Sequence, residues 1–260
     1  MEVHSHTHTA VPDPSTNSGH RGRKKWTHYL WEFLMLFLAV YCGFLAENFR
    51  EHKVEKAREK EYIKTMISDL QEDTASLNNI MNIRKRKGIE LDSLIYLLNA
   101  PEIKEYGAEL YFYGRVINRM GVFTCTDRTI EQMRNAGAFR LIRNDVAASG
   151  IVAYYSAINK INFFETSTTQ EAENFTRSDS KMLFNALVFE TMVNDKTNND
   201  VIKPTGNPQL ITYDKSTILN ATSTLHYLQT SRRNLQLQSA SLKESALKLI
   251  ELLRKEYHLE

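Results

Sequence analysis

The chain has 260 residues, 42% hydrophobic and 25% charged, which is an ordinary balance for one domain of about 200 residues beside a short appendage. Its 33 basic residues nearly match its 31 acidic ones and intermix with them, so the net charge of +2 argues against a nucleic-acid partner. Ten glycines and five prolines leave long uninterrupted tracts that favour helix over sheet, and we therefore expect an all-α fold.

Residues 1–25 combine proline, serine, threonine, asparagine, glycine and histidine without periodicity, which indicates a disordered tail. Four histidines of this tail could chelate a transition metal flexibly: His4, His6, His8 and His20. Zinc sites usually draw their ligands from a folded scaffold of set geometry, and none is visible around these histidines. We expect a solvated tail, and we predict no metal and no cofactor.

An apolar run follows the tail. The 14 residues from Phe33 to Ala46 carry no charge, and counting back to Trp26 gives 21, about 31 Å of helix, which matches a bilayer core of roughly 30 Å. Aromatic rings gather at one end of the run, where the headgroup layer favours them. We therefore predict a transmembrane helix over residues 26–47. Glu32 lies one turn inside the aromatic edge; we expect it to reach the interface, the alternative being a polar contact between protomers.

A cleaved signal and a soluble core helix both fit this run less well than a membrane span does. A signal peptide cut after Ala46 would place Phe44 at the position minus 3, where a small residue is needed, and a lipoprotein signal would not have Tyr41 before its cysteine. A soluble core helix would need a packing partner, yet both flanks of the run turn abruptly polar. We therefore expect a permanent anchor in the lipid bilayer.

The positive charges bear on the orientation of this anchor. Four basic residues stand between Arg21 and Lys25, which favours retention of the tail in the cytoplasm, but six more lie between Arg50 and Lys64. The charge rule leans toward a single-pass protein of the inner (cytoplasmic) membrane, with its tail in the cytoplasm and residues 48–260 in the periplasm.

Beyond the run, three segments carry apolar residues at heptad spacing, which predicts three helices of about 40 to 50 residues. Proline at position 101 ends the first segment, and the second lacks Gly and Pro from Ile151 to Val193. We expect residues 48–260 to form an elongated antiparallel helical bundle. The seam positions are Ile63, Met66, Leu70, Leu77, Ile80, Leu91, Leu94 and Leu98 in the first segment, Ile151, Tyr154, Ile158, Ile161, Ala172, Phe175, Met182, Ala186 and Phe189 in the second, and Ala221, Leu225, Leu228, Leu235, Leu242, Ala246, Leu249 and Leu253 in the third.

Polar residues interrupt two of these seams. Asp73, Arg84 and Lys87 stand in the first, and Arg232 and Ser239 stand in the last. Because one bundle would bury such seams incompletely, we expect a homo-oligomer in which a second copy covers the remainder.

Connectivity assigns the remaining segments. If the first helix leaves the membrane and the second returns, residues 194–216, rich in Asn, Asp, Pro and Gly, turn near the bilayer before the last helix departs. Residues 101–144 then form a small helical tip at the distal end.

The expected tip gathers residue types that recognise partners. Asp127 can cap a helix, Gly137 can end it in the left-handed conformation, and Asn144 or Asp145 can cap the next. Capping does not explain four arginines, which could clamp a carboxylate or phosphate, or could instead pair with glutamates of the bundle. Together with two tyrosines they are the predicted ligand or partner contacts: Arg128, Arg134, Arg140, Arg143, Tyr111 and Tyr113.

The basic run from Arg84 to Lys87 could bind acidic lipid or nucleic acid. It lies 38 residues beyond Ala46, about 57 Å along a straight helix, whereas the Debye length is about 8 Å. We therefore expect a solvated helix face.

Four stretches of the sequence resemble a known group of proteins. MEVHSHTHTA, KKWTHYLWEFLMLFLAVYCGFLAENFREH, EKAREKEYIKTMISDLQEDT and DRTIEQMRNAGAFRLIRN together look like a family of single-span membrane proteins common in Bacteroidetes. The likeness is dense over residues 1–75 and 127–144 and thin elsewhere. It implies the same span and a cell-envelope location, but the family has no established activity, so no catalytic or binding residues carry over.

Catalytic signatures are missing from the sequence, which has no H-E-x-x-H, no G-x-S-x-G, no phosphate loop and no C-x-x-C. We therefore expect a membrane-anchored helical protein that works by interaction, as an envelope scaffold or as a ligand-sensing ectodomain. An envelope protein is a further candidate partner. The alternative from another class is a metal-assisted envelope enzyme that uses the N-terminal histidines or a site at the tip.

Overall fold

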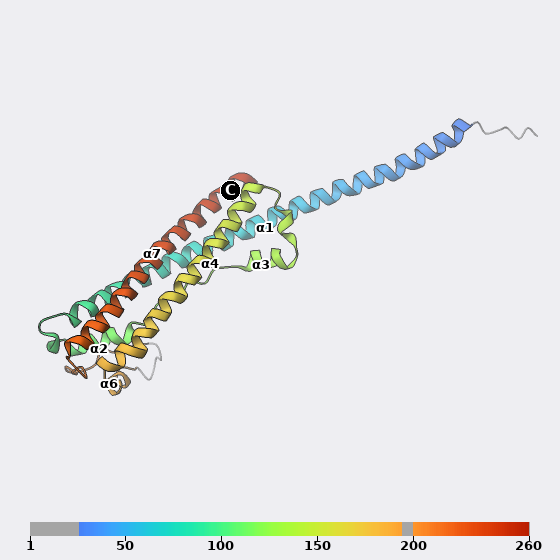
Figure 1. Cartoon of the computed structure of the whole chain (residues 1–260). Helices are drawn as coiled ribbons and strands as arrows, with labels where there is room; N and C mark the ends of the chain where they lie inside the picture. The colour runs from blue at the N-terminus through green and yellow to red at the C-terminus, as the bar shows by residue number, and fades with distance from the viewer. Residues whose placement is uncertain (1–25, 194–199, 260) are drawn as a thin grey trace, which may run out of the picture. The chain divides into compact units, whose positions relative to one another are not determined.

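The computed structural model describes residues 26–193 and 200–259, which form helices joined by short connections (Figure 1). Over these two ranges the β pairing is limited to one antiparallel bridge between Val193 and Val201, so the predicted all-α class is confirmed. The predicted tail with its histidines lies outside the described residues, as do residues 194–199 of the predicted loop. The elements in chain order are α1 (Trp26–Leu98), η1 (Ile103–Glu105), α2 (Gly107–Val116), α3 (Arg128–Asn135), η2 (Ala138–Leu141), α4 (Asp145–Asn174), η3 (Phe175–Ser180), α5 (Lys181–Leu183), α6 (Ala186–Glu190) and α7 (Lys215–Tyr257).

The chain divides into two compact units, Met1–Val54 and Glu55–Glu260. The first contains the beginning of α1, which is the one helix of the described part that is long and apolar enough to cross a membrane, judged by length and composition. Protein atoms cover none of its apolar window, so its side chains are available to lipid. Glu32 lies 3.3 Å from Nε2 of His28, so the carboxylate has a polar neighbour one turn away on the same helix.

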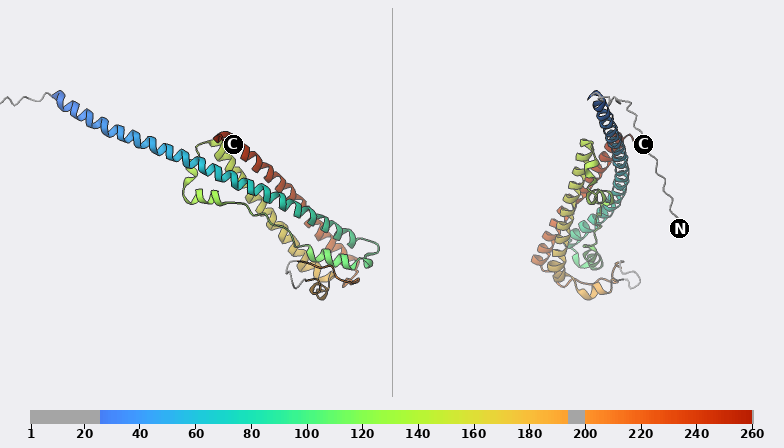
Figure 2. Two further views of the ribbon diagram at one scale, coloured as in Figure 1. Left: turned by 180° about the vertical axis from the view of Figure 1, so that it is seen from behind. Right: turned by 90° about the vertical axis from the view of Figure 1, so that its right-hand side faces the viewer.

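Three long helices run side by side in the second unit: the part of α1 from Glu55 onward, α4 and α7 (Figures 1 and 2). Every heptad position predicted for the first and last seams is buried. The heptad pattern of α1 and α7 is therefore the pattern of their packing, as expected for bundle helices.

The middle helix is shorter than predicted. α4 gives way to the single π-helical turn η3 and the short α5, and the chain leaves the helical conformation at Phe184, where ψ is 131°. There the ring of Phe184 packs edge-on against Tyr111, with 5.1 Å between the ring centroids. Heptad positions as far as Phe175 are buried, whereas Met182 is 43% exposed. Packing of one aromatic side chain thus overrides a helical tract that has no glycine or proline.

α4 runs parallel to α1, and α7 runs antiparallel to both. The predicted return of the second long helix is therefore wrong. The contacts that fix these directions are Tyr154 with Asp73 and Glu165 with Arg84 for α4, and Gln229 with Asp92 and Tyr257 with Glu59 for α7.

Residues 119–127, which we call the return segment, form no helix and carry the chain back along α1. The carbonyl of Gly121 accepts from the guanidinium of Arg84, and the N–H of Thr126 donates to Asp73 at 2.6 Å. The two contacts are five residues apart on the return segment and eleven apart on α1. Non-helical chain covers up to about 3.3–3.6 Å per residue and a helix about 1.5 Å, so both stretches span about 17 Å. Five extended residues of the return segment therefore carry the chain back over the distance that eleven residues of α1 cover.

The predicted distal tip is consequently split between the two ends of the bundle. α2 lies at the end where α1 stops, since Leu110 shares a buried apolar cluster with Leu98. α3 and η2 lie at the end where α1 enters the second unit, since Met133 belongs to the cluster of Ile63. Residues 101–144 are therefore not one compact substructure.

The described part of the predicted membrane-proximal loop packs against α2. The Oδ1 of Asn207 accepts from the N–H of Gly107 at 2.7 Å, and the carbonyl of Gln209 accepts from the hydroxyl of Tyr111 at 3.1 Å. This loop thus lies at the same end of the bundle as α2, which corrects the predicted separation of the two.

A polar layer divides the core into the two apolar clusters. On α1 the first cluster reaches Ile80 and the second begins at Leu91; on α7 they are separated between Leu228 and Leu235. The polar layer consists of Arg84 of α1, Glu165 of α4, and Arg232 and Ser239 of α7, each at most 8% exposed.

Candidate functional site

Buried carboxylates of α1 hold the chain between α2 and α4. Non-helical chain packed on a helical bundle, like the first turn of a helix, has no backbone partner for its N–H groups, which must be satisfied in another way. Three N–H groups of this chain donate to α1: Arg143 to Glu59, Thr129 to Asp69 and Thr126 to Asp73, at 2.9, 3.0 and 2.6 Å. These acidic residues therefore position the return segment and α3. Burial raises the pKa of Asp73, although its hydrogen bonds to Tyr154 and Thr126 oppose that effect.

Arg84 is the centre of the polar layer. Its guanidinium donates to Oγ of Ser239 at 2.6 Å and to the carbonyl of Gly121 at 3.2 and 3.3 Å, and it forms an ion pair with Glu165. Glu165 also accepts from the N–H of Phe123 at 3.0 Å. A buried ion pair needs such additional hydrogen bonds to offset desolvation, which here lowers the pKa of Arg84. The layer thus joins three helices to the return segment.

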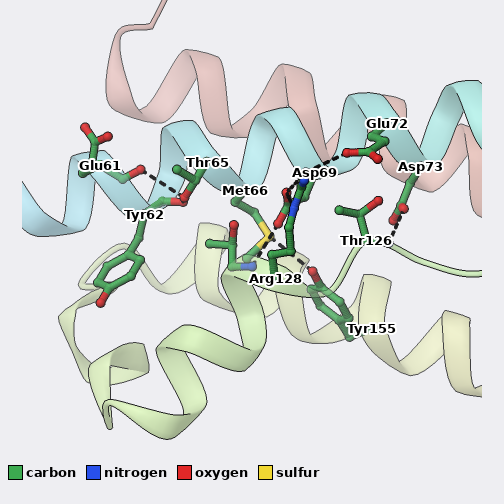
Figure 3. A network of polar contacts seen from close by, with 11 residues as sticks. Glu61, Tyr62, Thr65, Met66, Asp69, Glu72, Asp73, Thr126, Arg128 and Tyr155 are labelled. Atoms are coloured by element: carbon green, nitrogen blue, oxygen red, sulfur yellow. Dashed lines mark hydrogen bonds and ion pairs between the residues drawn. The ribbon is translucent and has the colours of Figure 1, made fainter.

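Arg128, the first residue of α3, binds the surface of α1 (Figure 3). Its Nε and Nη2 lie 3.2 and 2.9 Å from Oδ1 of Asp69, and Nη2 lies 2.6 Å from Glu72. Asp69 is only 3% exposed, whereas the Arg128 side chain is largely exposed. Arg128 therefore ties α3 to α1 by neutralising a buried carboxylate.

Two of the three predicted caps are present. The Oδ1 of Asn144 accepts from the N–H of Ala147 at 3.0 Å at the start of α4, and Gly137 has a φ of 60°. Asp127 precedes α3 without a side-chain capping bond.

The remaining predicted arginines do not join Arg128 in one clamp. Arg143 pairs with Glu55, which is 14 residues, or about 21 Å of helix, from Asp69 on α1. Arg134 pairs with a glutamate of its own helix. Arg140 is exposed and makes no hydrogen bond or ion pair with a residue of the described ranges. Pairing with acidic residues of the bundle, the alternative to a clamp, describes Arg128 and Arg143.

The two predicted tyrosines lie at the opposite end of the second unit. Tyr111 is fully buried, and its hydroxyl accepts from the N–H of Asn185 at 2.9 Å. It is therefore a core residue that a surface partner cannot contact, which corrects the prediction. Tyr113 is half-buried and lines a recess of about 510 Å³ with Tyr96 and Tyr106.

A candidate site is a pocket of about 570 Å³ between α1 and α7 beside the polar layer, which we call the α1–α7 pocket. Pockets of roughly 300 to 1,000 Å³ accept small molecules. Basic residues dominate the charged lining, which consists of Arg84, Lys85, Asp92, Arg232 and Arg233.

Two of these four cations have an acidic partner and two do not. Arg84 pairs with Glu165, and Arg233 lies 3.9 Å from Asp92. Lys85 and Arg232 form no ion pair with any residue in the described parts of the chain. The pocket therefore holds two cations without an ion pair, of which Lys85 is exposed and Arg232 is buried.

Arg232 is the more unusual of the two because it is only 7% exposed. Its Nη1 and Nη2 donate to the carbonyls of Lys87 and Ile117, and its Nε has no acceptor. Burial lowers its pKa to about 10, partly opposed by the charge of Glu90, so the guanidinium stays charged at neutral pH. A buried charge without an ion-pair partner costs stability, and a bound anion would reduce that cost.

The basic run Arg84 to Lys87 differs from the predicted solvated face. Arg84 is in the core and Lys87 is half-buried beside Glu90 at 2.6 Å, whereas Lys85, which lines the pocket, and Arg86 are both exposed. Sequence reasoning singled out the basic run at Arg84 and named Arg232 only as an interruption of a seam. It did not join the two, because they lie on helices about 150 residues apart in the chain.

The described residues contain no group of three or more His, Cys, Asp or Glu side chains suited to a metal ion. Comparison of the chain with protein-family models, with curated proteins and with solved structures gives no match. The function is therefore argued from the fold and the pocket.

Proposed function

We propose that the protein is a membrane-anchored helical bundle that senses a ligand by binding it. The observation that carries this proposal is the α1–α7 pocket, whose lining includes the buried Arg232 and the exposed Lys85, neither of which has an ion-pair partner among the described residues. A scaffold needs only an outer surface, and the buried charge of Arg232 would merely destabilise it. A ligand that supplies the missing negative charge gives it a function.

The apolar start of α1 supports the anchored part of the proposal. Its side chains are uncovered by protein, and the charge distribution around it favours the inner membrane with the second unit in the periplasm. The resemblance to the Bacteroidetes family, the homo-oligomer and an envelope protein partner stay predictions. So does the alternative of a metal-assisted enzyme, whose N-terminal histidines lie outside the described residues.

Anchoring and orientation can be measured in cells that express the full chain. We expect the protein to sediment with the inner membrane, to resist carbonate extraction and to dissolve in detergent. Alkaline phosphatase fused after Glu260 should be active, because it would reach the periplasm. An inactive phosphatase fusion, together with a fluorescent fusion that glows at the same position, would reverse the orientation. Release by carbonate would contradict the anchor.

Sensing can be tested with the full chain in phosphatidylcholine nanodiscs. A low-molecular-weight extract of the cell envelope should raise the melting temperature, because a ligand that binds only the folded state stabilises it by mass action. The matched control is Gly88→Leu, in which a leucine is added at the pocket wall. Equal shifts in both proteins, or no shift in either, would contradict a sensing role for this pocket.

A further inference from the structure

Three tyrosines line one recess of the second unit, which we call the tyrosine recess. Tyr96 belongs to α1, Tyr106 stands directly before α2, and Tyr113 lies within α2. Tyr106 and Tyr113 are half-buried and pack against the apolar cluster of Leu98, whereas Tyr96 is 74% exposed. The recess has a volume of about 510 Å³, which suits a small molecule. The core therefore holds two of the rings in place, and the third borders the solvent.

No cation of the described residues lies over these three rings. The cation–ring contacts of the described ranges involve the rings of Phe49, Phe164, Phe189 and Tyr213. Tyr113 meets Phe112 edge-on, with 5.6 Å between the ring centroids, and such a contact covers at most one face of a ring. The face of an aromatic ring is negative and attracts cations, and proteins recognise quaternary ammonium ligands in this way. The rings therefore keep faces on which an external cation can bind.

The charged residues that line the recess are both acidic. Asp92 of α1 and Glu109 of α2 belong to the lining, which includes no lysine or arginine of the described residues. A hydrogen bond from Lys203 lowers the pKa of Glu109, so this carboxylate is ionised at neutral pH. Lys203 lies outside the lining, as does Arg233, which is 3.9 Å from Asp92. The lining itself therefore contributes negative charge only.

We propose that the tyrosine recess binds a small organic ammonium, with its positive charge on the faces of Tyr96, Tyr106 and Tyr113 and near the carboxylates of Asp92 and Glu109. A divalent metal ion fits less well, because such ions take about six to eight oxygen ligands and the described residues contain no group of three or more His, Cys, Asp or Glu suited to a metal. A neutral ligand would gain nothing from the carboxylates.

This second site goes beyond the proposed sensing function. The tyrosine recess contains neither Lys85 nor Arg232, although Ile89 and Asp92 line both hollows. Its ligand has the opposite charge from the anion expected in the α1–α7 pocket. The two proposals can therefore be tested separately, with different probes and different variants.

The test uses the full chain in dodecyl maltoside micelles, whose headgroups carry neither a charge nor an ammonium. Choline and 3,3-dimethylbutan-1-ol form a matched pair of probes, because they share their shape and hydroxyl and differ in a carbon that replaces the charged nitrogen. Saturation-transfer NMR at millimolar probe should detect binding of choline and little or none of the neutral alcohol. Added salt should weaken choline binding, because it screens the partly exposed carboxylates.

Two exposed tyrosines provide variants that spare the core. Tyr96 is 74% exposed and lines the recess, whereas Tyr227 of α7 is 75% exposed and does not. Both Tyr96→Leu and Tyr227→Leu should fold as well as the wild type. We expect the dissociation constant for choline to rise about three- to tenfold in Tyr96→Leu, as for loss of a cation–ring contact, and to stay unchanged in Tyr227→Leu.

The half-buried ring of Tyr106 separates binding from a merely structural role. Tyr106→Phe keeps the ring and should keep choline binding, whereas Tyr106→Leu removes the ring face and should weaken binding. Glu109→Gln should also weaken binding, because it removes a lining carboxylate. Lys203→Gln should strengthen it, because it removes the cation that pairs with Glu109. A general loss of stability would not change the affinity in these two opposite directions.

Several outcomes would overturn the assignment. They are equal binding of choline and the neutral alcohol, equal effects of Tyr96→Leu and Tyr227→Leu, equal affinities of Tyr106→Leu and Tyr106→Phe, undiminished binding in Glu109→Gln, or no binding of choline at millimolar concentration. None of these results depends on the extract experiment or on membrane fractionation.

Discussion

Arg84 of α1 and Ser239 of α7, each of which interrupts an apolar seam in the sequence, meet inside the bundle, where Nη1 of Arg84 donates to Oγ of Ser239 at 2.6 Å. The other interruptions at Asp73 and Arg232 are likewise buried within one chain. The polar breaks therefore do not require a second copy to cover them. Self-association stays a prediction, but the incomplete seams no longer give a reason for it.

Arg84 and Glu165 should be strongly coupled in their effect on the free energy of unfolding, because each neutralises the other in the core. A double-mutant cycle measures this coupling. Arg84→Met leaves Glu165 charged and buried at 8% exposure, so we expect a loss of about 3 to 5 kcal/mol in the free energy of unfolding. Adding Glu165→Gln removes the orphan charge and keeps an acceptor for the return segment. The double variant should therefore lose less than the sum of the two single losses, as urea unfolding in mild detergent will show.

The matched control for this cycle is the exposed pair Glu244 and Lys248 on one face of α7. Solvent screens such a pair, so the same cycle there should show little coupling. Strict additivity at Arg84 and Glu165 would contradict their assignment as a coupled buried pair.

The heptad pattern predicted most of α1 and α7, because helix formation and amphipathic packing are encoded locally. It also placed the polar interruptions on the packed faces: Asp73, Arg84, Arg232 and Ser239 are buried in register with leucines, and Lys87 is half-buried. The heptad pattern could not identify the hydrogen-bond or ion-pair partner of each polar residue. A polar residue on a seam is equally consistent with a gap or with a buried bond, and only the fold distinguishes them.

The heptad pattern could not predict the direction of α4 or the α1–α7 pocket, for a different reason. Apolar periodicity is the same for a parallel and an antiparallel helix, so the direction of α4 depends on the short return segment, which has no periodicity to read. The α1–α7 pocket is lined by Lys85 of one helix and Arg232 of another, and such a meeting of helices far apart in the chain has no local signal. The arginine-rich motif did give a local signal, but Arg128 and Arg143 of this motif pair with acidic residues of α1.

Asp73 should make the stability depend on pH in a stated direction. Its pKa in the folded protein is raised above the ordinary value of 3.8 by burial, so the folded state binds this proton more tightly than the unfolded state. The contribution of Asp73 to stability is therefore fully present below pH 3.8 and is lost as the pH rises through its folded pKa. Compared with Asp73→Asn, the wild type should lose stability as the pH is raised across this window, measured by urea unfolding at a series of pH values.

The control for this experiment is Asp69→Asn, because Asp69 also accepts a backbone N–H but has an ion pair with Arg128. If the stability of the wild type relative to that of Asp73→Asn stayed constant or increased as the pH rose, the raised pKa of Asp73 would be wrong.

Two glycines should respond to alanine in opposite directions. Gly88 lies in the interior of α1 with open space around a Cβ, so Gly88→Ala should stabilise the protein by about 0.5 to 1 kcal/mol through helix propensity. At Gly107 a Cβ would lie 2.0 Å from the backbone oxygen of Pro208, so Gly107→Ala should destabilise it by about 1 to 3 kcal/mol. Thermal unfolding followed by circular dichroism compares both with the wild type. Stabilisation at Gly107 would mean that the loop of Pro208 does not pack on α2.

Three substitutions around the predicted arginine site should differ in how much stability they remove. Asp69→Ala removes the acceptor for the buried N–H of Thr129, so we expect a loss of about 1 to 3 kcal/mol in the free energy of unfolding. Arg128→Ala leaves that acceptor in place but removes the neutralising charge, so its loss should be smaller, and salt should reduce the difference from the wild type because the arginine is exposed. Arg140→Ala should leave the melting temperature unchanged, because this side chain contacts no partner among residues 26–193 and 200–259. A melting temperature lowered as far by Arg140→Ala as by Arg128→Ala would show that these arginines stabilise the protein in some other arrangement, and the ties between α3 and α1 would have to be rejected.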